Sequence, residues 1–265
     1  MIAEFVVKML VSYLLGSVVG ALLIGKLRGV DIRRLGSGNA GGTNALRTQG
    51  KAFAFWVMAI DIGKGWLATG PIARLIVPGL SHRVIAVASI SVNPQEEIRR
   101  FLDETASSFP WFDPAPDGWL AAACGIAVIL GHVYPIFYGF RGGKGVATLI
   151  GSVLGMNPLL IIPMLVTWLL AVLLFGFVGL ASILGTFALA AIGVMGVLEQ
   201  HLPVLALYVL YDLRVMGSQL YLFSFGVLAT VLIVFTHRSN IARMRSGTES
   251  RAQRLWLFAS RGGGV

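Results

Sequence analysis

Residues 158–178, PLLIIPMLVTWLLAVLLFGFV, form an apolar segment that contains no charged side chain. A helix needs about 20 mostly apolar residues to cross the hydrocarbon core of a bilayer. This segment meets that length. It therefore favours an integral membrane protein over a soluble domain.

Six further apolar runs accompany it, at 9–24, 52–60 continuing to 78, 119–138, 145–156, 180–198 and 218–236. Of the 265 residues, 56% are hydrophobic and only 12% are charged, whereas about a quarter of the residues of a soluble domain are charged. We expect an all-α integral membrane protein with about seven transmembrane helices, in one domain that spans residues 1–265. The short run 145–156 is expected to be tilted, or joined to the next run by a break at Asn157 and Pro158.

The net charge of +9 is unevenly distributed along the chain. Basic residues concentrate in 25–51, 139–144 and 238–261, whereas 93–118 carries six acidic residues. Because Lys- and Arg-rich loops remain in the cytoplasm, we expect the N-terminus outside and the C-terminus in the cytoplasm. The stretch 93–118 is then an extracytoplasmic insertion between spans two and three. The basic excess is an orientation signal and an anion site, and it does not indicate nucleic-acid binding.

Residues 36–47, GSGNAGGTNALR, contain glycines in the G-x-G-x-x-G spacing of dinucleotide-binding sites. That reading requires a βαβ unit, which a helical membrane protein does not provide. The polar residues of the loop, together with the guanidinium fork of Arg47, favour phosphate binding instead. The alternative is a polar loop whose glycines only make turns. The candidate residues beside Arg47 are Ser37, Gly38, Asn39, Thr43 and Asn44.

Residues 131–148, GHVYPIFYGFRGGKGVAT, place three glycines around Lys144 at the start of the next helix. Consecutive glycines let backbone N–H groups converge on an anion, and a helix N-terminus adds unpaired amides. The spacing does not match a phosphate-binding Walker A loop. We expect a phosphate site, with a flexible interfacial turn as the alternative. Its candidate residues are His132, Arg141, Gly142, Gly143, Lys144 and Gly145. His132 alone is equally compatible with a helix-end residue that bonds a carbonyl.

Two further groups of polar residues stand out. His237 and Asn240 leave the last helix at i, i+3 and share one helical face, either as site residues or as part of a basic interfacial anchor. Asp61 and Lys64 lie inside an apolar run, where each charge costs about 2.5–3.5 kcal/mol on insertion scales. Their spacing predicts an ion pair, which either is purely structural or also orients the site. The single cysteine, Cys124, allows neither a disulfide nor a thiolate metal site.

With these motifs in order, the chain resembles the bacterial acyl-phosphate:glycerol-3-phosphate acyltransferases, the PlsY family. The matching patterns are S-G-N-x-G-A-T-N-x-x-R from Ser37 to Arg47, D-x-x-K-G from Asp61 to Gly65, G-H-x-x-P-x-F…G-G-K-G-V-A-T from Gly131 to Thr148, and H-R-x-N-I-x-R-L-x-x-G-x-E from His237 to Glu249. Departures from the family pattern, at Gly42, Arg141 and Met244, remove no hydrogen-bond donor. Residues from about 85 to 117 are extra relative to the family.

The resemblance implies transfer of an acyl group from acyl phosphate to the 1-hydroxyl of glycerol 3-phosphate, which yields lysophosphatidic acid and phosphate. It implies that the catalytic residues Ser37, Arg47, Lys144, His237 and Asn240 line the glycerol 3-phosphate site and that Glu249 mainly holds the tail in shape. We expect Asp61 and Lys64 to give structural support. The resemblance implies no cofactor and no metal, and we expect a monomer in the bacterial inner membrane, with its site on the cytoplasmic face. An organophosphate transporter or exchanger is the alternative, and it would need a midplane site served from both sides.

Overall fold

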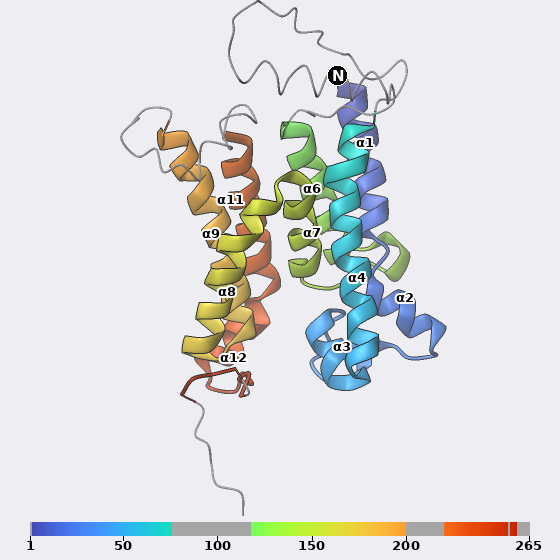
Figure 1. Cartoon of the computed structure of the whole chain (residues 1–265). Coiled ribbons are helices and arrows are strands. Elements are labelled where there is room, and N and C mark those ends of the chain that lie inside the picture. Colours follow the sequence, from blue (N-terminus) through green and yellow to red (C-terminus); the bar gives the residue numbers. More distant parts are fainter. Residues whose placement is uncertain (1, 76–117, 200–219, 254, 259–265) are drawn as a thin grey trace, which may run out of the picture.

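The computed structural model describes residues 2–75, 118–199, 220–253 and 255–258 (Figure 1). Their regular elements are helices, as the composition predicts. The α-helices are α1 (Ile2–Gly16), α2 (Gly20–Leu27), α3 (Gly42–Gln49), α4 (Lys51–Leu67), α6 (Gly118–Val133), α7 (Val146–Met156), α8 (Ile161–Phe175), α9 (Val178–Glu199), α11 (Leu220–Thr236) and α12 (Arg238–Arg245). The predicted insertion lies outside the described residues, except for Gly118 at the start of α6.

Each of the seven apolar runs contains a helix within the described residues. Three stretches, 118–138, 158–175 and 178–195, are long and apolar enough to cross a membrane alone, and the bent pairs α1–α2 and α11–α12 raise this number to five. A count of seven spans and the orientation of the two termini stay predictions. The expected break after α7 is present, because the Asn157 side chain accepts a hydrogen bond from Leu159 N and starts a short 3-10 turn.

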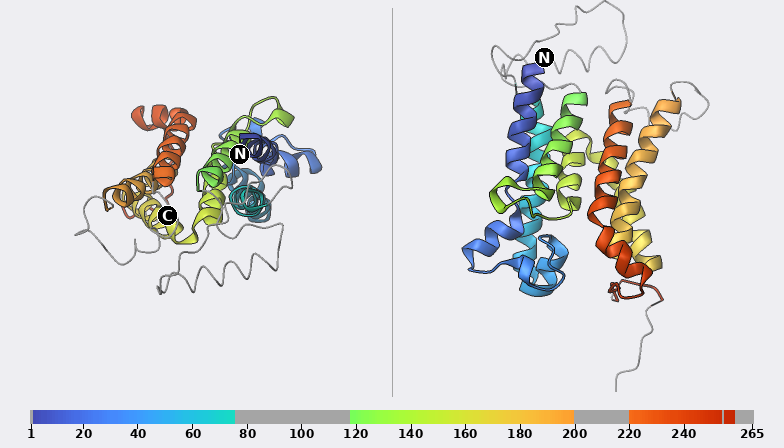
Figure 2. Two further views of the ribbon diagram at one scale, coloured as in Figure 1. Left: turned by 90° about the horizontal axis from the view of Figure 1, so that it is seen from above. Right: turned by 180° about the vertical axis from the view of Figure 1, so that it is seen from behind.

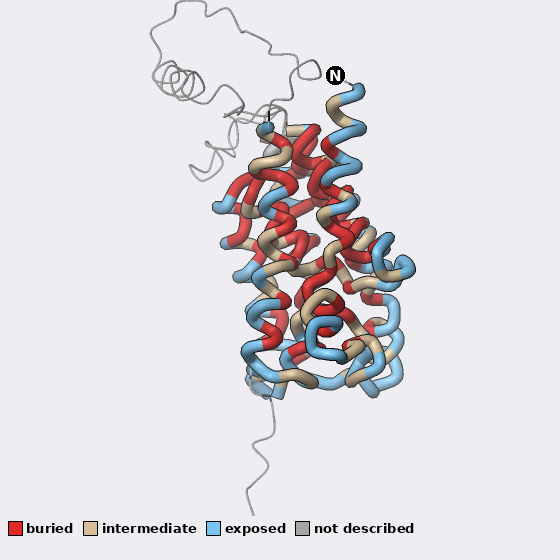
Figure 3. The backbone as a smooth tube through the Cα atoms, turned by 90° about the vertical axis from the view of Figure 1, so that its right-hand side faces the viewer, coloured by how far each residue is buried: buried red, intermediate tan, exposed pale blue. Residues whose placement is uncertain are grey.

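The helices form two adjoining groups (Figures 1 and 2). In one group α1 packs on α6 and α4 packs on α7, while in the other α9 packs on both α8 and α11. Contacts between α6 and α11 join the groups. Buried residues run through the interior, as Figure 3 shows, and large apolar side chains such as Leu170 and Leu228 are exposed on the outside. Such an outer surface suits contact with lipid rather than water.

The first apolar run differs from the prediction of one span over 9–24. The helix begins at Ile2, stops at Gly16 and resumes at Gly20 with a bend of 46°. Gly16 and Gly131 each lie where a Cβ atom would overlap the backbone of the facing helix. Small residues therefore let α1 and α6 approach closely, as is common in membrane bundles.

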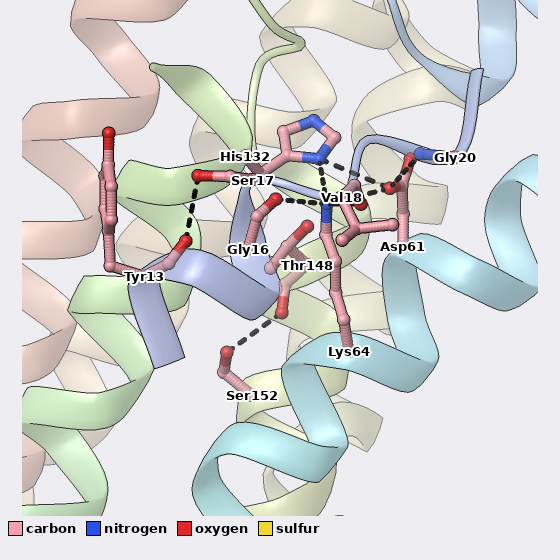
Figure 4. A network of polar contacts seen from close by, with 10 residues as sticks. All are labelled: Tyr13, Gly16, Ser17, Val18, Gly20, Asp61, Lys64, His132, Thr148 and Ser152. Carbon is pink, nitrogen blue, oxygen red and sulfur yellow. Dashed lines mark hydrogen bonds and ion pairs between the residues drawn. The ribbon is translucent and has the colours of Figure 1, made fainter. Parts of the chain in front are cut away.

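The break after Gly16 leaves backbone groups without helical partners, and α4 supplies replacements (Figure 4). The Lys64 ammonium donates to the carbonyls of Gly16 and Val18, at 2.8 Å each, and lies 3.1 Å from the Asp61 carboxylate. That carboxylate accepts a hydrogen bond from Gly20 N at 3.1 Å. The predicted ion pair is present, and it joins α4 to both sides of the broken helix.

We expect Lys64→Met to destabilise the protein strongly. The substitution leaves the Asp61 charge buried and unpaired, a change that typically costs about 3–5 kcal/mol. Thermal unfolding of the detergent-solubilised protein measures the effect, with Lys51→Met at the exposed start of α4 as the matched control. Adding Asp61→Asn to Lys64→Met removes the unpaired charge and should recover part of the loss. A wild-type Tm for Lys64→Met would refute this role.

Candidate active site

The three polar clusters predicted from the sequence meet at one cavity of about 310 Å³. Ser37, Gly38 and Asn39 line it from the loop before α3. Arg141, Gly142, Gly143 and Lys144 line it from the loop before α7. Thr236, Arg238, Ser239 and Arg243 contribute from the end of α11 and from α12. Residues separated by about 200 positions in the sequence thus face the same space.

Asn44 shapes the first loop from within. Its Oδ1 accepts a hydrogen bond from Ser37 N at 2.9 Å, and its Nδ2 lies within bonding distance of the carbonyls of Leu35 and Asn39, at 3.0 Å each. The side chain is buried, with 2% of its surface exposed. The sequence predicted a phosphate ligand here, but the polar atoms of Asn44 are occupied by the loop. Asn44 therefore holds Ser37 in place at the cavity wall.

The glycine-rich loop also differs from the expected anion nest. The N–H groups of Gly142 and Gly143 donate to the carbonyls of Val133 and His132, at 3.1 Å each. A Cβ atom on either residue would overlap His132, at its backbone for Gly142 and at its ring for Gly143. These two glycines therefore permit a close approach to the end of α6, and their amides are not available to a phosphate. Gly145, at a φ of +87°, starts α7 in the left-handed region.

His132 is not among the residues that line the cavity, and Figure 4 shows its ring beside Lys64 and Asp61. Its Nδ1 is 2.9 Å from the Lys64 ammonium and 3.3 Å from the Asp61 carboxylate. Because an ammonium group only donates, Nδ1 accepts that hydrogen bond and the ring proton is assigned to Nε2, the atom nearest Gly143. His132 thus connects the Asp61–Lys64 pair to the loop, and its binding of phosphate stays a prediction.

Lys144 belongs to a chain of polar contacts that runs from the loop to the tail. Its ammonium donates to Asn240 Oδ1. Asn240 Nδ2 donates to one oxygen of Glu249, and Arg243 Nε donates to the other, at 2.6 Å each. The Thr236 hydroxyl also donates to the Lys144 carbonyl at 3.1 Å. Glu249 therefore orients Asn240, which in turn orients Lys144, in line with the supporting role that the resemblance implies for it.

His237 lies in the turn after the end of α11, and neither it nor Asn240 is among the residues that line the cavity, although Thr236, Arg238 and Ser239 beside them are. His237 is buried, and its Nδ1 lies 2.8 Å from the carbonyl of Ile233. A carbonyl only accepts, so Nδ1 carries a proton and donates it to Ile233. Burial, followed by the nearby Lys144 ammonium, lowers the pKa of His237 to about 4. The imidazole is consequently neutral near pH 7 and is a weak base.

Burial, followed by repulsion from Arg243, likewise lowers the pKa of Lys144 to about 8, against the opposing attraction of Glu249. Lys144 is therefore still mainly cationic near neutral pH. Its charge is therefore sensitive to a modest rise in pH.

Arg47 and Thr43 lie on α3, outside the lining of the cavity. Arg47 Nη2 donates to the hydroxyl of Ser250 at 3.2 Å, which ties α3 to the tail. The sequence analysis missed a second contact between distant loops. Both carboxylate oxygens of Asp31 accept hydrogen bonds from Arg33, at 3.0 Å each, and Arg33 Nη1 donates to Tyr138 O at 3.2 Å. The D-x-R spacing of Asp31 and Arg33 was the only sequence signal for this contact.

The chain is similar to known proteins over most of its length. The family model described as glycerol-3-phosphate acyltransferase matches residues 6–247. The glycerol-3-phosphate acyltransferase of Chlorobaculum tepidum is 34% identical over 250 residues, which is 93% of this chain and 96% of that protein. The corresponding protein of Chlorobium limicola is also 34% identical, over 91% of this chain and 93% of that protein.

Solved structures agree with these sequence matches. The glycerol 3-phosphate form of PlsY (YgiH), an integral membrane glycerol 3-phosphate acyltransferase, gives a TM-score of 0.63 at 29% identity, over 93% of this chain and 94% of that one. Its lysophosphatidic acid form gives a TM-score of 0.61 and covers the same fractions of the two chains.

Proposed function

Because the chain belongs to the glycerol-3-phosphate acyltransferase family, we propose that it transfers an acyl group from acyl phosphate to the 1-hydroxyl of glycerol 3-phosphate. The products are lysophosphatidic acid and inorganic phosphate, in the first step of phospholipid synthesis. The single observation that carries this proposal is the convergence of the three polar clusters on one cationic cavity.

The charge of the cavity fits substrates that carry phosphate. Its described lining contains four cationic side chains and no carboxylate, and the cations are Arg141, Lys144, Arg238 and Arg243. Hydrogen bonds between such cations and phosphate oxygens are stronger than bonds between neutral groups. Ser37, Gly38 and Asn39 line the same cavity, and we assign to them the glycerol part of the substrate. Both substrates carry a phosphate group, and this lining suits both.

In the proposed reaction, the 1-hydroxyl oxygen forms a bond to the acyl carbon while the bond from that carbon to the phosphate oxygen breaks. Lys144, held by Asn240, stabilises the charge that gathers on the departing phosphate. The low pKa of His237 makes it a weak base, so we assign the proton of the hydroxyl to the phosphate itself, which leaves as hydrogen phosphate. His237 and Ser37 then position glycerol 3-phosphate, and Arg47 braces the site through Ser250. No cofactor or metal enters this scheme.

The location of the cavity supports an enzyme over a transporter. α3 and α12, which flank the cavity loops, lie at the same end of the helical bundle (Figure 1). A transporter site lies near the bilayer midplane and is reached from both sides. We propose that this end faces the cytoplasm of the bacterial inner membrane, where the basic loops belong, and that the protein acts as a monomer.

An activity assay tests the proposal directly. Purified protein in vesicles should form lysophosphatidic acid from acyl phosphate and glycerol 3-phosphate, and none from acyl-CoA. Lys144→Ala should lower kcat/KM at least about tenfold, because it removes one charge-assisted bond, and Arg47→Ala should also impair turnover. Lys26→Ala, an exposed cation away from the cavity, is the control. Uptake of glycerol 3-phosphate into vesicles without any acyl product would instead favour the transporter.

The pH dependence of kcat/KM should reflect the ionisation of Lys144. Lysine is cationic only below its pKa, so phosphate binding to the free enzyme should weaken as the pH rises through about 8. In Lys144→Arg the side chain stays charged at far higher pH, and the decline near pH 8 should disappear from whatever activity remains. Persistence of the same decline in that variant would show that another group titrates.

Replacing His237 distinguishes positioning from base catalysis. Asparagine retains a side-chain donor but cannot accept a proton near neutral pH, so His237→Asn should keep measurable kcat and the same decline near pH 8. His237→Ala should lower kcat much more, because alanine has no side chain that can form a hydrogen bond. If His237→Asn is as inactive as His237→Ala, the imidazole is the general base and substrate-assisted proton transfer is wrong.

A further inference from the structure

The tail beyond the family motifs folds back against the end of α8. The backbone N–H groups of Ala252 and Leu257 donate to the carbonyls of Gly176 and Leu173, at 2.8 and 3.0 Å, and Trp256 Nε1 donates to Leu174 O at 3.2 Å. The last carbonyls of a helix have no partners within it. The tail thus satisfies three carbonyls at this end of α8, and it is fixed at the depth where that membrane segment ends.

Three apolar side chains of the tail are nevertheless exposed. Leu257 and Phe258 each expose 66% of their surface, and Leu255 exposes 46%. The adjoining turn of α8 is also exposed, with 48% at both Leu174 and Phe175. The exposed apolar residues at the end of α8 are thus joined, through these hydrogen bonds, to a tail segment that also exposes apolar side chains.

The sequence that contains these side chains carries almost only positive charge. Residues 238–261 contain six arginines and one acidic residue, Glu249, which is already bonded to Asn240 and Arg243. The guanidinium of Arg251 lies 4.0 Å from the ring centre of Trp256 and 4.9 Å from that of Phe177. Tryptophan is enriched at the boundary between membrane and water, and arginines near that boundary attract anionic headgroups.

We propose that residues 251–258 form an interfacial anchor, in which Leu255, Leu257 and Phe258 insert into the lipid beside α8 and the arginines contact anionic headgroups. The occupant of this apolar surface is the membrane itself, because the tail is hydrogen-bonded to the end of an apolar membrane segment and its sequence is strongly basic. Ser250 directly precedes the anchor. The anchor consequently holds the Ser250–Arg47 and Glu249–Asn240 contacts at the membrane surface.

Spin labels at two positions test the proposal independently of catalysis. A single cysteine replaces Leu257 in one variant and exposed Thr248 in the other, both in a Cys124→Ala background, and the proteins are placed in vesicles that contain phosphatidylglycerol. The label at 257 should collide several-fold more often with oxygen than with the water-soluble nickel chelate, and the label at 248 should show the opposite preference. Equal nickel accessibility at both positions would overturn the anchor.

Two further outcomes identify the occupant. A label at 257 that is shielded from both reagents would mean that protein, such as a second copy of the chain, covers the surface, and the membrane assignment would be wrong. In vesicles of phosphatidylcholine alone the label should lie closer to water, because the arginines lose their anionic partners. The same depth in both kinds of vesicle would refute the assigned role of anionic lipid.

Discussion

A single buried ammonium group holds together the half of the molecule that carries the first two site loops. Lys64 contacts two carbonyls of the broken first helix, the carboxylate of Asp61 and the imidazole of His132. Hydrocarbon offers no water to satisfy an interrupted helix, so backbone groups at a break need partners from the protein. The break is therefore stable only because a charge on α4 reaches it, and that charge is stable only because of the break and Asp61.

This arrangement connects the interior of the bundle to the cavity. Lys64 fixes His132, and His132 packs against the glycines that precede Lys144. On the opposite side of the cavity, Glu249 fixes Asn240, which bonds the same Lys144. The lysine proposed to meet the departing phosphate is thus supported by the membrane core on one side and by the tail on the other. The residues that support it, His132, Asn240 and Glu249, are not among those that line the cavity.

Sequence patterns predicted which loops line the candidate cavity, but not which partners each polar residue bonds within it. Apolar runs predicted the helices, since lipid imposes a length and a composition on any span. The motifs also predicted that Ser37, Arg141 and Lys144 lie together, and they face one cavity. Asn44, His132 and the amides of Gly142 and Gly143 were expected at the phosphate, yet carbonyls and side chains of the protein occupy them. A motif shows that a polar residue is needed, but the partner that it bonds depends on tertiary contacts between distant loops.

The bond between Arg47 and Ser250 joins residues 203 positions apart, and it bears on how the protein is made. The ribosome synthesises the chain from its N-terminus. The helices on both sides of the loop before α3 are therefore made long before α12. Until the final helices emerge, Lys144 lacks Asn240 and the cavity lacks one wall. On the proposed mechanism, a nascent chain therefore cannot yet transfer acyl groups, and a product truncated before residue 237 would lie in the membrane without acyltransferase activity.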